Sequence, residues 1–136
     1  MANTKPIGVA YSDQDISGAD NVLVNQQLGY TTAAQGTVTQ ATSKSTGVTL
    51  NTSAGQITTN AASLGATTNV TFTLTNSYIS SNDTLILTIS SGGTSGAYNV
   101  WCSGLSAGSA TITLRNITAG ALAEAVVINF ALIHCQ

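Results

Sequence analysis

Apolar and polar residues alternate strictly over several short stretches of this chain, and the alternation limits the folds it can adopt. From 69 to 75, Val70, Phe72 and Leu74 occupy every second position, with Asn or Thr between them. Successive side chains of a β-strand point to opposite faces of a sheet, so this period of two predicts a strand with one buried face.

Two later stretches, 84–90 and 109–115, alternate in the same way. In the second, we expect Ala110, Ile112 and Leu114 to point inward and Thr111, Thr113 and Arg115 to point outward. Shorter or less regular candidate strands lie at 37–40, 46–50, 56–59, 97–103 and 124–133. No stretch of ten or more residues has a helical period, although 119–125 could form one helical turn. The predicted fold class is therefore all-β, an antiparallel β-sandwich or barrel-like domain.

The first 35 residues differ from the rest of the chain. They contain the only proline, Pro6, and three of the five acidic residues, but little sustained periodicity. Two short apolar pieces, 7–11 and 22–24, could each form a short strand. We therefore expect residues 1–35 to form an extended N-terminal arm and residues 36–136 to form the β-sandwich domain.

Charged residues are scarce, with three basic and five acidic side chains among 136 residues, whereas an average domain is about one quarter charged. With so few cations, neither nucleic acid nor an anionic membrane is an expected partner. Natural sheets usually protect their edges with lysines, which this chain almost lacks. We therefore expect its edge strands to be covered by a neighbouring subunit or by the arm, which implies a homo-oligomer.

One acidic stretch resembles the opening of a calcium-binding loop. Asp13, Asp15 and Ser17 alternate, and Gly18 stands at the sixth position. The twelfth position, where such loops carry a bidentate glutamate, is Val24. A solvated loop explains this stretch better, and the sequence predicts no metal site and no cofactor.

The residues that could support catalysis do not form a recognisable motif. His134 has no nucleophile elbow or similar signature elsewhere in the chain, and a structural or solvated role is expected for it. Asp83 and Glu124 could pair as glycosidase carboxylates, but the turn 80–83 accounts for Asp83. Cys102 and Cys135 have no zinc-site spacing, so we expect free thiols, with a disulfide as the alternative. The sequence predicts no catalytic site.

Trp101 falls on the strand face opposite Tyr98, Val100 and Cys102. One face of this strand is therefore expected to be an interface or a second packing layer. Trp101 and the tyrosines Tyr11, Tyr30, Tyr78 and Tyr98 could alternatively form a platform on which sugars stack. Packing in the core is the commoner role for lone aromatic residues in strands.

Three stretches resemble small structural proteins of tailed bacteriophages: the opening 1–11, the turn and strand 91–100, and 108–116 continuing through 119–131. The chain is similar in these places to head decoration (cement) proteins, which are β-rich and often trimeric. The resemblance implies a non-enzymatic virion protein, made in the host cytoplasm, that binds the outer capsid surface. It carries over no active site, and Cys102 and Cys135 have no place in it.

The partners implied are the major capsid protein and further copies of this chain, with a trimer favoured. We expect the arm to add strands to its neighbours and Trp101 to contact them. The candidate interface residues are Pro6, Ile7, Val9, Tyr11, Val22, Val24 and Trp101. The alternative is a tail fibre, spike or adhesin module that binds a host surface glycan; a small hydrolase is less favoured. Residues 1–9 carry no recognisable secretory signal, and 121–133 is too short to span a membrane.

Overall fold

The structure is a computed structural model and describes residues 20–135 of the chain. Eight strands follow a short 3-10 helix, η2 (Thr32–Ala34). The strands are β1 (Gln35–Thr39), β2 (Val48–Thr49), β3 (Ala54–Thr58), β4 (Asn69–Thr75), β5 (Thr84–Ser91), β6 (Tyr98–Ser106), β7 (Ser109–Asn116) and β8 (Val127–Ile133). The predicted all-β class is confirmed, and β4 has the predicted bounds.

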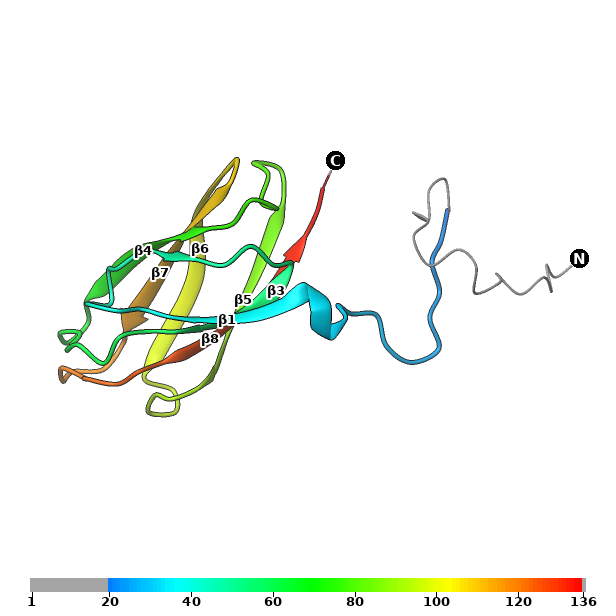
Figure 1. Ribbon diagram of the computed structural model, residues 1–136. Helices are drawn as coiled ribbons and strands as arrows, with labels where there is room; N and C mark the ends of the chain where they lie inside the picture. The colour runs from blue at the N-terminus through cyan, green and yellow to red at the C-terminus, as the bar shows by residue number, and fades with distance from the viewer. Residues whose placement is uncertain (1–19, 136) are drawn as a thin grey trace, which may run out of the picture.

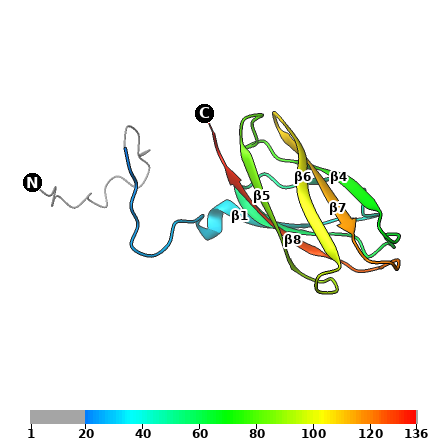
Figure 2. The same ribbon diagram turned by 180° about the vertical axis from the view of Figure 1, so that it is seen from behind.

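The strands form two four-stranded sheets that pack face to face as a sandwich (Figures 1 and 2). The first sheet has the order β1-β3-β8-β5, and the second has the order β2-β4-β7-β6. One side of the sandwich is therefore bordered by β5 and β6, and the opposite side by β1 and β2.

Both sheets are mixed, so the prediction of a wholly antiparallel sandwich was wrong in this respect. β1 pairs in parallel with β3, and β2 pairs in parallel with β4. The reason is that the chain alternates between the sheets from β1 to β4, so each sheet receives a second strand running in the same direction. The remaining pairs, including the β6–β7 hairpin, are antiparallel.

The core lies between the two sheets and includes apolar residues that the alternation assigned to the inward faces of β4 and β7. Ile112 and Leu114 of β7, Leu74 of β4 and Ile128 of β8 are completely buried. Burying one such side chain contributes about 1.5–3 kcal/mol, so these positions supply much of the stability of the fold.

Some sequence predictions need correction. Thr113 points outward as expected but is 4% exposed, because the hydroxyls of Thr71 and Ser103 lie 3.1 and 2.9 Å from its own hydroxyl. Residues 22–24 form no strand in the described chain. Residues 119–125 form no helical turn; instead, Leu122 forms an isolated bridge with Leu64. The predicted strand at 7–11 lies outside the described residues.

Candidate assembly surface

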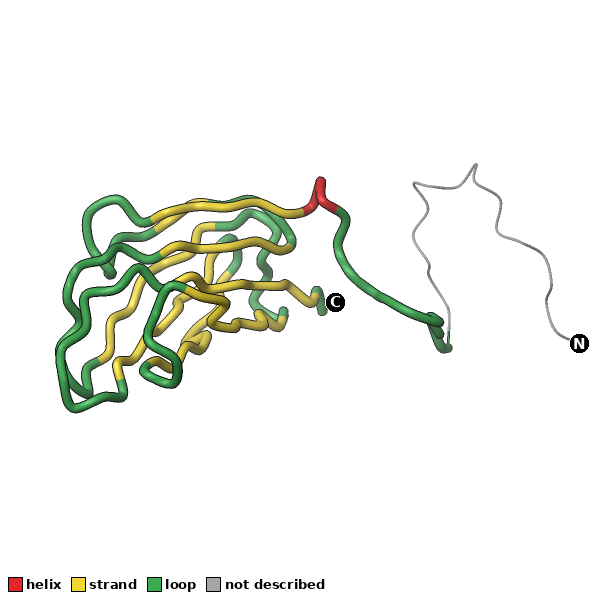
Figure 3. Tube along the Cα trace, turned by 90° about the horizontal axis from the view of Figure 1, so that it is seen from below, coloured by secondary structure: helices red, strands yellow, loops and turns green. Residues whose placement is uncertain are grey.

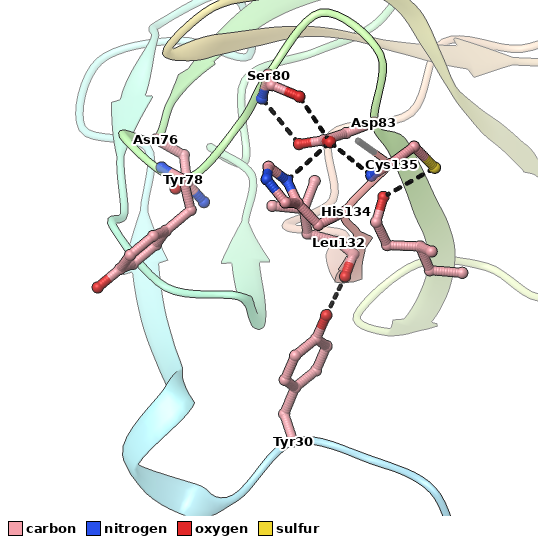
Figure 4. A network of polar contacts seen from close by, with 9 residues as sticks. Tyr30, Asn76, Tyr78, Ser80, Asp83, Leu132, His134 and Cys135 are labelled. Atoms are coloured by element: carbon pink, nitrogen blue, oxygen red, sulfur yellow. Dashed lines mark hydrogen bonds and ion pairs between the residues drawn. The ribbon is translucent and has the colours of Figure 1, made fainter. Parts of the chain in front are cut away.

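The arm is fixed to the sandwich at Tyr30. The Tyr30 hydroxyl donates a hydrogen bond to the carbonyl oxygen of Leu132 at the end of β8 (Figure 4). The side-chain amide of Gln35 donates to the carbonyl oxygen of Tyr30 at 3.0 Å. The described chain before it, residues 20–29, leads away from the sandwich (Figure 3). Tyr30 is therefore the point from which the described part of the arm extends.

Four large apolar side chains in this part of the arm are exposed. Val22 is 55% exposed, Leu23 92%, Val24 51% and Leu28 84%. Single exposed apolar residues are common in monomers, but here four lie within seven residues, separated only by the uncharged stretch Asn25-Gln26-Gln27. Val22 and Val24 were predicted as interface residues, whereas Leu23 and Leu28 were missed, although the run 22–24 was visible in the sequence.

A buried carboxylate lies beside the arm attachment. Asp83 accepts hydrogen bonds from the amide and hydroxyl of Ser80 at 2.8 and 2.7 Å and from the amide of Cys135 at 3.0 Å. Nδ1 of His134 lies 2.8 Å from the same carboxylate (Figure 4). Loss of water around Asp83 would raise its pKa, but the bonds from Ser80, Cys135 and His134 together lower that pKa well below its usual value. The cluster thus holds the chain end against the turn before β5.

This cluster lacks the parts of a catalytic triad. A histidine held by an aspartate becomes a general base only when a hydroxyl or thiol is within reach of its other nitrogen. Within residues 20–135, no hydroxyl or thiol is hydrogen-bonded to His134, and the Ser80 hydroxyl is bound to Asp83 instead. The contact that the described structure gives to His134 is the one to Asp83, which joins the chain end to the turn before β5.

The second candidate carboxylate belongs to a separate network. Glu124 accepts hydrogen bonds from the hydroxyl of Thr94 at 2.6 Å and from its amide at 3.1 Å. These bonds, the hydroxyl of Tyr98 and the charge of Lys44 lower the pKa of Glu124. Asp83 therefore binds the turn before β5 and the chain end, whereas Glu124 binds the loop that contains Thr94. Their hydrogen bonds do not join them as a pair of glycosidase carboxylates.

Lys44 was not singled out from the sequence, yet it is 3% exposed. Its ammonium group donates to the carbonyl oxygens of Asn60 and Glu124 and lies 3.5 Å from the Thr59 hydroxyl. Burial lowers the pKa of Lys44, while the charge of Glu124 acts in the opposite direction. Lys44 thus ties the β1–β2 connection to two distant loops, and only the tertiary structure shows this role.

The outer face of the second sheet carries Trp101, which is 39% exposed. Trp101 lies directly opposite Thr113, and Asn99 lies opposite Arg115 on the same face. The other polar residues of this face are Asn69 of β4 and neutral threonines and serines of β4, β6 and β7. Among residues 20–135, Arg115 is therefore the only charged side chain there.

The structure does not bring the candidate aromatic residues together. Tyr98 is buried, and its pKa is raised to about 12 by burial and by the nearby Glu124 carboxylate. Tyr30 and Tyr78 lie at the arm attachment (Figure 4), while Trp101 lies on the outer face of the second sheet. Trp101 and the described arm are thus separate candidate contacts. Pro6, Ile7, Val9 and Tyr11, like the stretch 13–18, lie outside the described residues.

Both cysteines are free thiols, Cys102 half-buried and Cys135 exposed. Within residues 20–135, no group of three or more His, Cys, Asp or Glu side chains is arranged to hold a metal ion. No helix in that range has the length and apolarity needed to cross a bilayer.

Comparisons of this chain with protein-family models, with curated proteins and with solved structures give no match.

Proposed function

We propose that this chain is a non-enzymatic structural protein of a bacteriophage virion that binds and stabilises the outer capsid surface, as a decoration protein does. The observation that carries the proposal is the exposed apolar arm segment 22–28 fixed to a β-sandwich at Tyr30. An extended chain of this kind can add a strand to a partner's sheet, where backbone hydrogen bonds supply affinity and apolar side chains supply specificity.

The low charge supports the same proposal. With three cations and five acidic residues in the whole chain, association depends mainly on apolar contact and backbone pairing. Binding to the capsid should therefore change little between low and high salt, because ionic strength weakens charge-dependent contacts most. The proposed contacts are the arm, including Val22 and Val24, and Trp101 on the outer face of the second sheet.

The proposal is tested by mixing the purified protein with capsids that lack it and counting the copies bound per capsid. We expect binding at repeated sites and a capsid that withstands higher temperature. A truncation that removes residues 1–28 but keeps Tyr30 should lose capsid binding while its far-ultraviolet circular dichroism remains that of the full chain. Normal capsid binding by this truncation would contradict the role of the arm.

The second candidate function is a tail fibre, spike or adhesin module that binds a host glycan. The observation that favours it is the exposed indole of Trp101 on a face of hydroxyl and amide side chains with one charged residue, Arg115, which suits sugar stacking and hydrogen bonding. Trp101→Ala should then abolish binding on a glycan array. The copy number per virion separates the two candidates, since a tail module is present in few copies and a capsid-coating protein in many.

A further inference from the structure

The sandwich is incompletely closed along the side bordered by β5 and β6. Ile89 of β5 pairs with the fully buried Ile128 and so belongs to the inward face, yet it is 37% exposed. Leu87 of β5 and Val100 of β6 are only partly buried against the core. Side chains that should be covered by a neighbouring strand therefore face solvent on this side.

A groove of about 350 Å³ lies on the same side, between the two edge strands. It is lined by residues of β5 and β6 and by the turn before β5: Asp83, Thr84, Leu85, Cys102, Ser103, Gly104 and Leu105. Leu85, Cys102 and Leu105 make its floor apolar, and Leu105 packs against the core. A strand placed in this groove would cover core residues of both sheets.

β5 is also the edge strand best able to accept a partner. β2 has two residues, β1 has five, and β6 is interrupted by a bulge between Cys102 and Gly104. β5 has eight residues, contains neither a charged residue nor a proline, and keeps regular register with β8 from Thr84 to Ile89. Its register with β8 shifts only near its end, between Ile89 and Ser91, so residues 84–89 lack the charges, prolines and bulges with which natural sheets prevent edge pairing.

The same chain carries a segment that fits this groove. Residues 22–28 contain Val22, Leu23, Val24 and Leu28, all exposed, and no charged residue. In Figures 1 and 2 this segment leads away from its own sandwich. From Tyr30, the nine residues back to Val22 can span at most about 30 Å, far enough to reach an adjacent molecule.

We propose that residues 22–28 of one copy lie along β5 in the β5–β6 groove of a second copy, so that the protein assembles by arm exchange. Backbone groups of the arm would pair with the free edge of β5, and the apolar side chains would cover Ile89 and Leu105. This inference rests on the proposed function and names the first partner of the arm. In this arrangement Val22 and Val24 contact a neighbouring copy within the assembly, and Trp101 remains a candidate capsid contact.

The contact is heterologous, since the arm of each subunit meets a different surface of the next one. Such contacts close into rings when the rotation between subunits permits and otherwise form open filaments. The expected product is an oligomer of this chain, closed or open. Native mass spectrometry of the full chain should show that oligomer, whereas removal of residues 1–28 should give a folded monomer.

Cys102 provides a direct test, because its side chain lines the groove. In a Cys135→Ser background, Leu23→Cys leaves one thiol on the arm and one in the groove. Mild oxidation should link different chains, visible as covalent oligomers on a non-reducing gel. Two separate control variants should give far less product. The first adds Cys102→Ser, which removes the thiol from the groove. The second carries Ala119→Cys in place of Leu23→Cys, which moves the other thiol off the arm. Linkage confined within single chains would overturn the exchange between copies.

Two matched substitutions on β5 provide a second test. Ile89→Lys places a charge on the inward face of β5, beyond the groove but on the proposed path of the arm along that strand, and should shift the protein to monomer at micromolar concentration. Ile86→Lys places the same charge on the outer face of the same strand, opposite Ala131, and should leave the oligomer intact. Circular dichroism verifies that both variants remain folded. An unchanged oligomer in Ile89→Lys, or a monomeric full-length protein, would overturn the inference.

The capsid assay separates this inference from the proposed function. If Ile89→Lys is monomeric and capsid binding falls with it, both stand. If the full chain is monomeric yet binds capsids at many sites, arm exchange is wrong and the function stands. If the oligomer forms by arm exchange but binds no capsid, the function is wrong and the inference about the groove stands.

Discussion

Nδ1 of His134 lies 2.8 Å from a carboxylate oxygen of Asp83, which joins the C-terminal end of the chain to the turn that precedes β5. The turn 80–83, the end of β8 and the arm attachment at Tyr30 meet in this region (Figure 4). A change in the stability of the carboxylate cluster should therefore affect the position of Tyr30, from which the arm extends.

Asp83 should make the free energy of unfolding depend on pH in the acid range. Its pKa is lowered in the folded protein, so its contribution is complete above the unfolded value of about 3.9 and is lost as the pH falls below that value. Asp83→Asn should unfold at lower denaturant concentration than the wild type at pH 7. Below pH 3 the difference should shrink. Urea titrations across this range measure both effects, and equal pH dependence of the two proteins would contradict the assignment.

Asn116 is a completely buried amide, and its replacement should be costly. Its Nδ2 donates to the carbonyl oxygens of Leu64, Gly65 and Gly120, and its Oδ1 accepts from Thr118. A buried polar group that loses its partner costs about 1–3 kcal/mol. Asn116→Ala should therefore lower the free energy of unfolding by at least about 2 kcal/mol. Asn99→Ala, at an exposed position of β6, is the control and should change it by less than about 0.5 kcal/mol.

Lys44 should stabilise the fold although its charge is buried. Lys44→Met preserves the aliphatic volume but leaves the carbonyl oxygens of Asn60 and Glu124 without their donor. We expect a loss of about 1–3 kcal/mol in the free energy of unfolding, measured by urea titration. Lys5→Met removes the same charge from the arm and is the control for net charge. A Lys44→Met protein as stable as the wild type would show that the carbonyls find other partners.

Ile112 should report the packing of the core without affecting the proposed contacts. It is completely buried in β7, so Ile112→Ala should cost about 2–5 kcal/mol and lower the thermal midpoint. Thr111→Ala, at the neighbouring outward position, should cost far less. Differential scanning calorimetry measures both variants, and similar midpoints would contradict the inward assignment of Ile112.

The strands were predictable because their signal is local. In β4 and β7 the buried apolar side chains are the ones that alternate in the sequence, since the pleat of a strand alone decides which residues share a face. The parallel pairs β1–β3 and β2–β4 were not predictable in this way. Whether two strands run in the same direction depends on how the chain crosses between sheets, and the alternation within each strand contains no information about that.

The candidate assembly surface also has some features that were predictable from the sequence and others that were not. The apolar character of Val22 and Val24 and the outward position of Trp101 are visible in the sequence. The contacts of Lys44 with Asn60 and Glu124, and the cluster around Asp83, join residues that lie far apart in the chain. The partial exposure of Ile89 likewise depends on where the edges of two sheets meet.

By itself, the sequence determined a Thr-rich β-protein with few charged residues and an arm that differs from the domain behind it, because composition and period of two are properties of consecutive residues. Only the tertiary structure decided that the edges of β5 and β6 lie on one side and leave core residues uncovered between them. Which edges remain free follows from the order of strands in both sheets, and that order is fixed by packing of the whole domain.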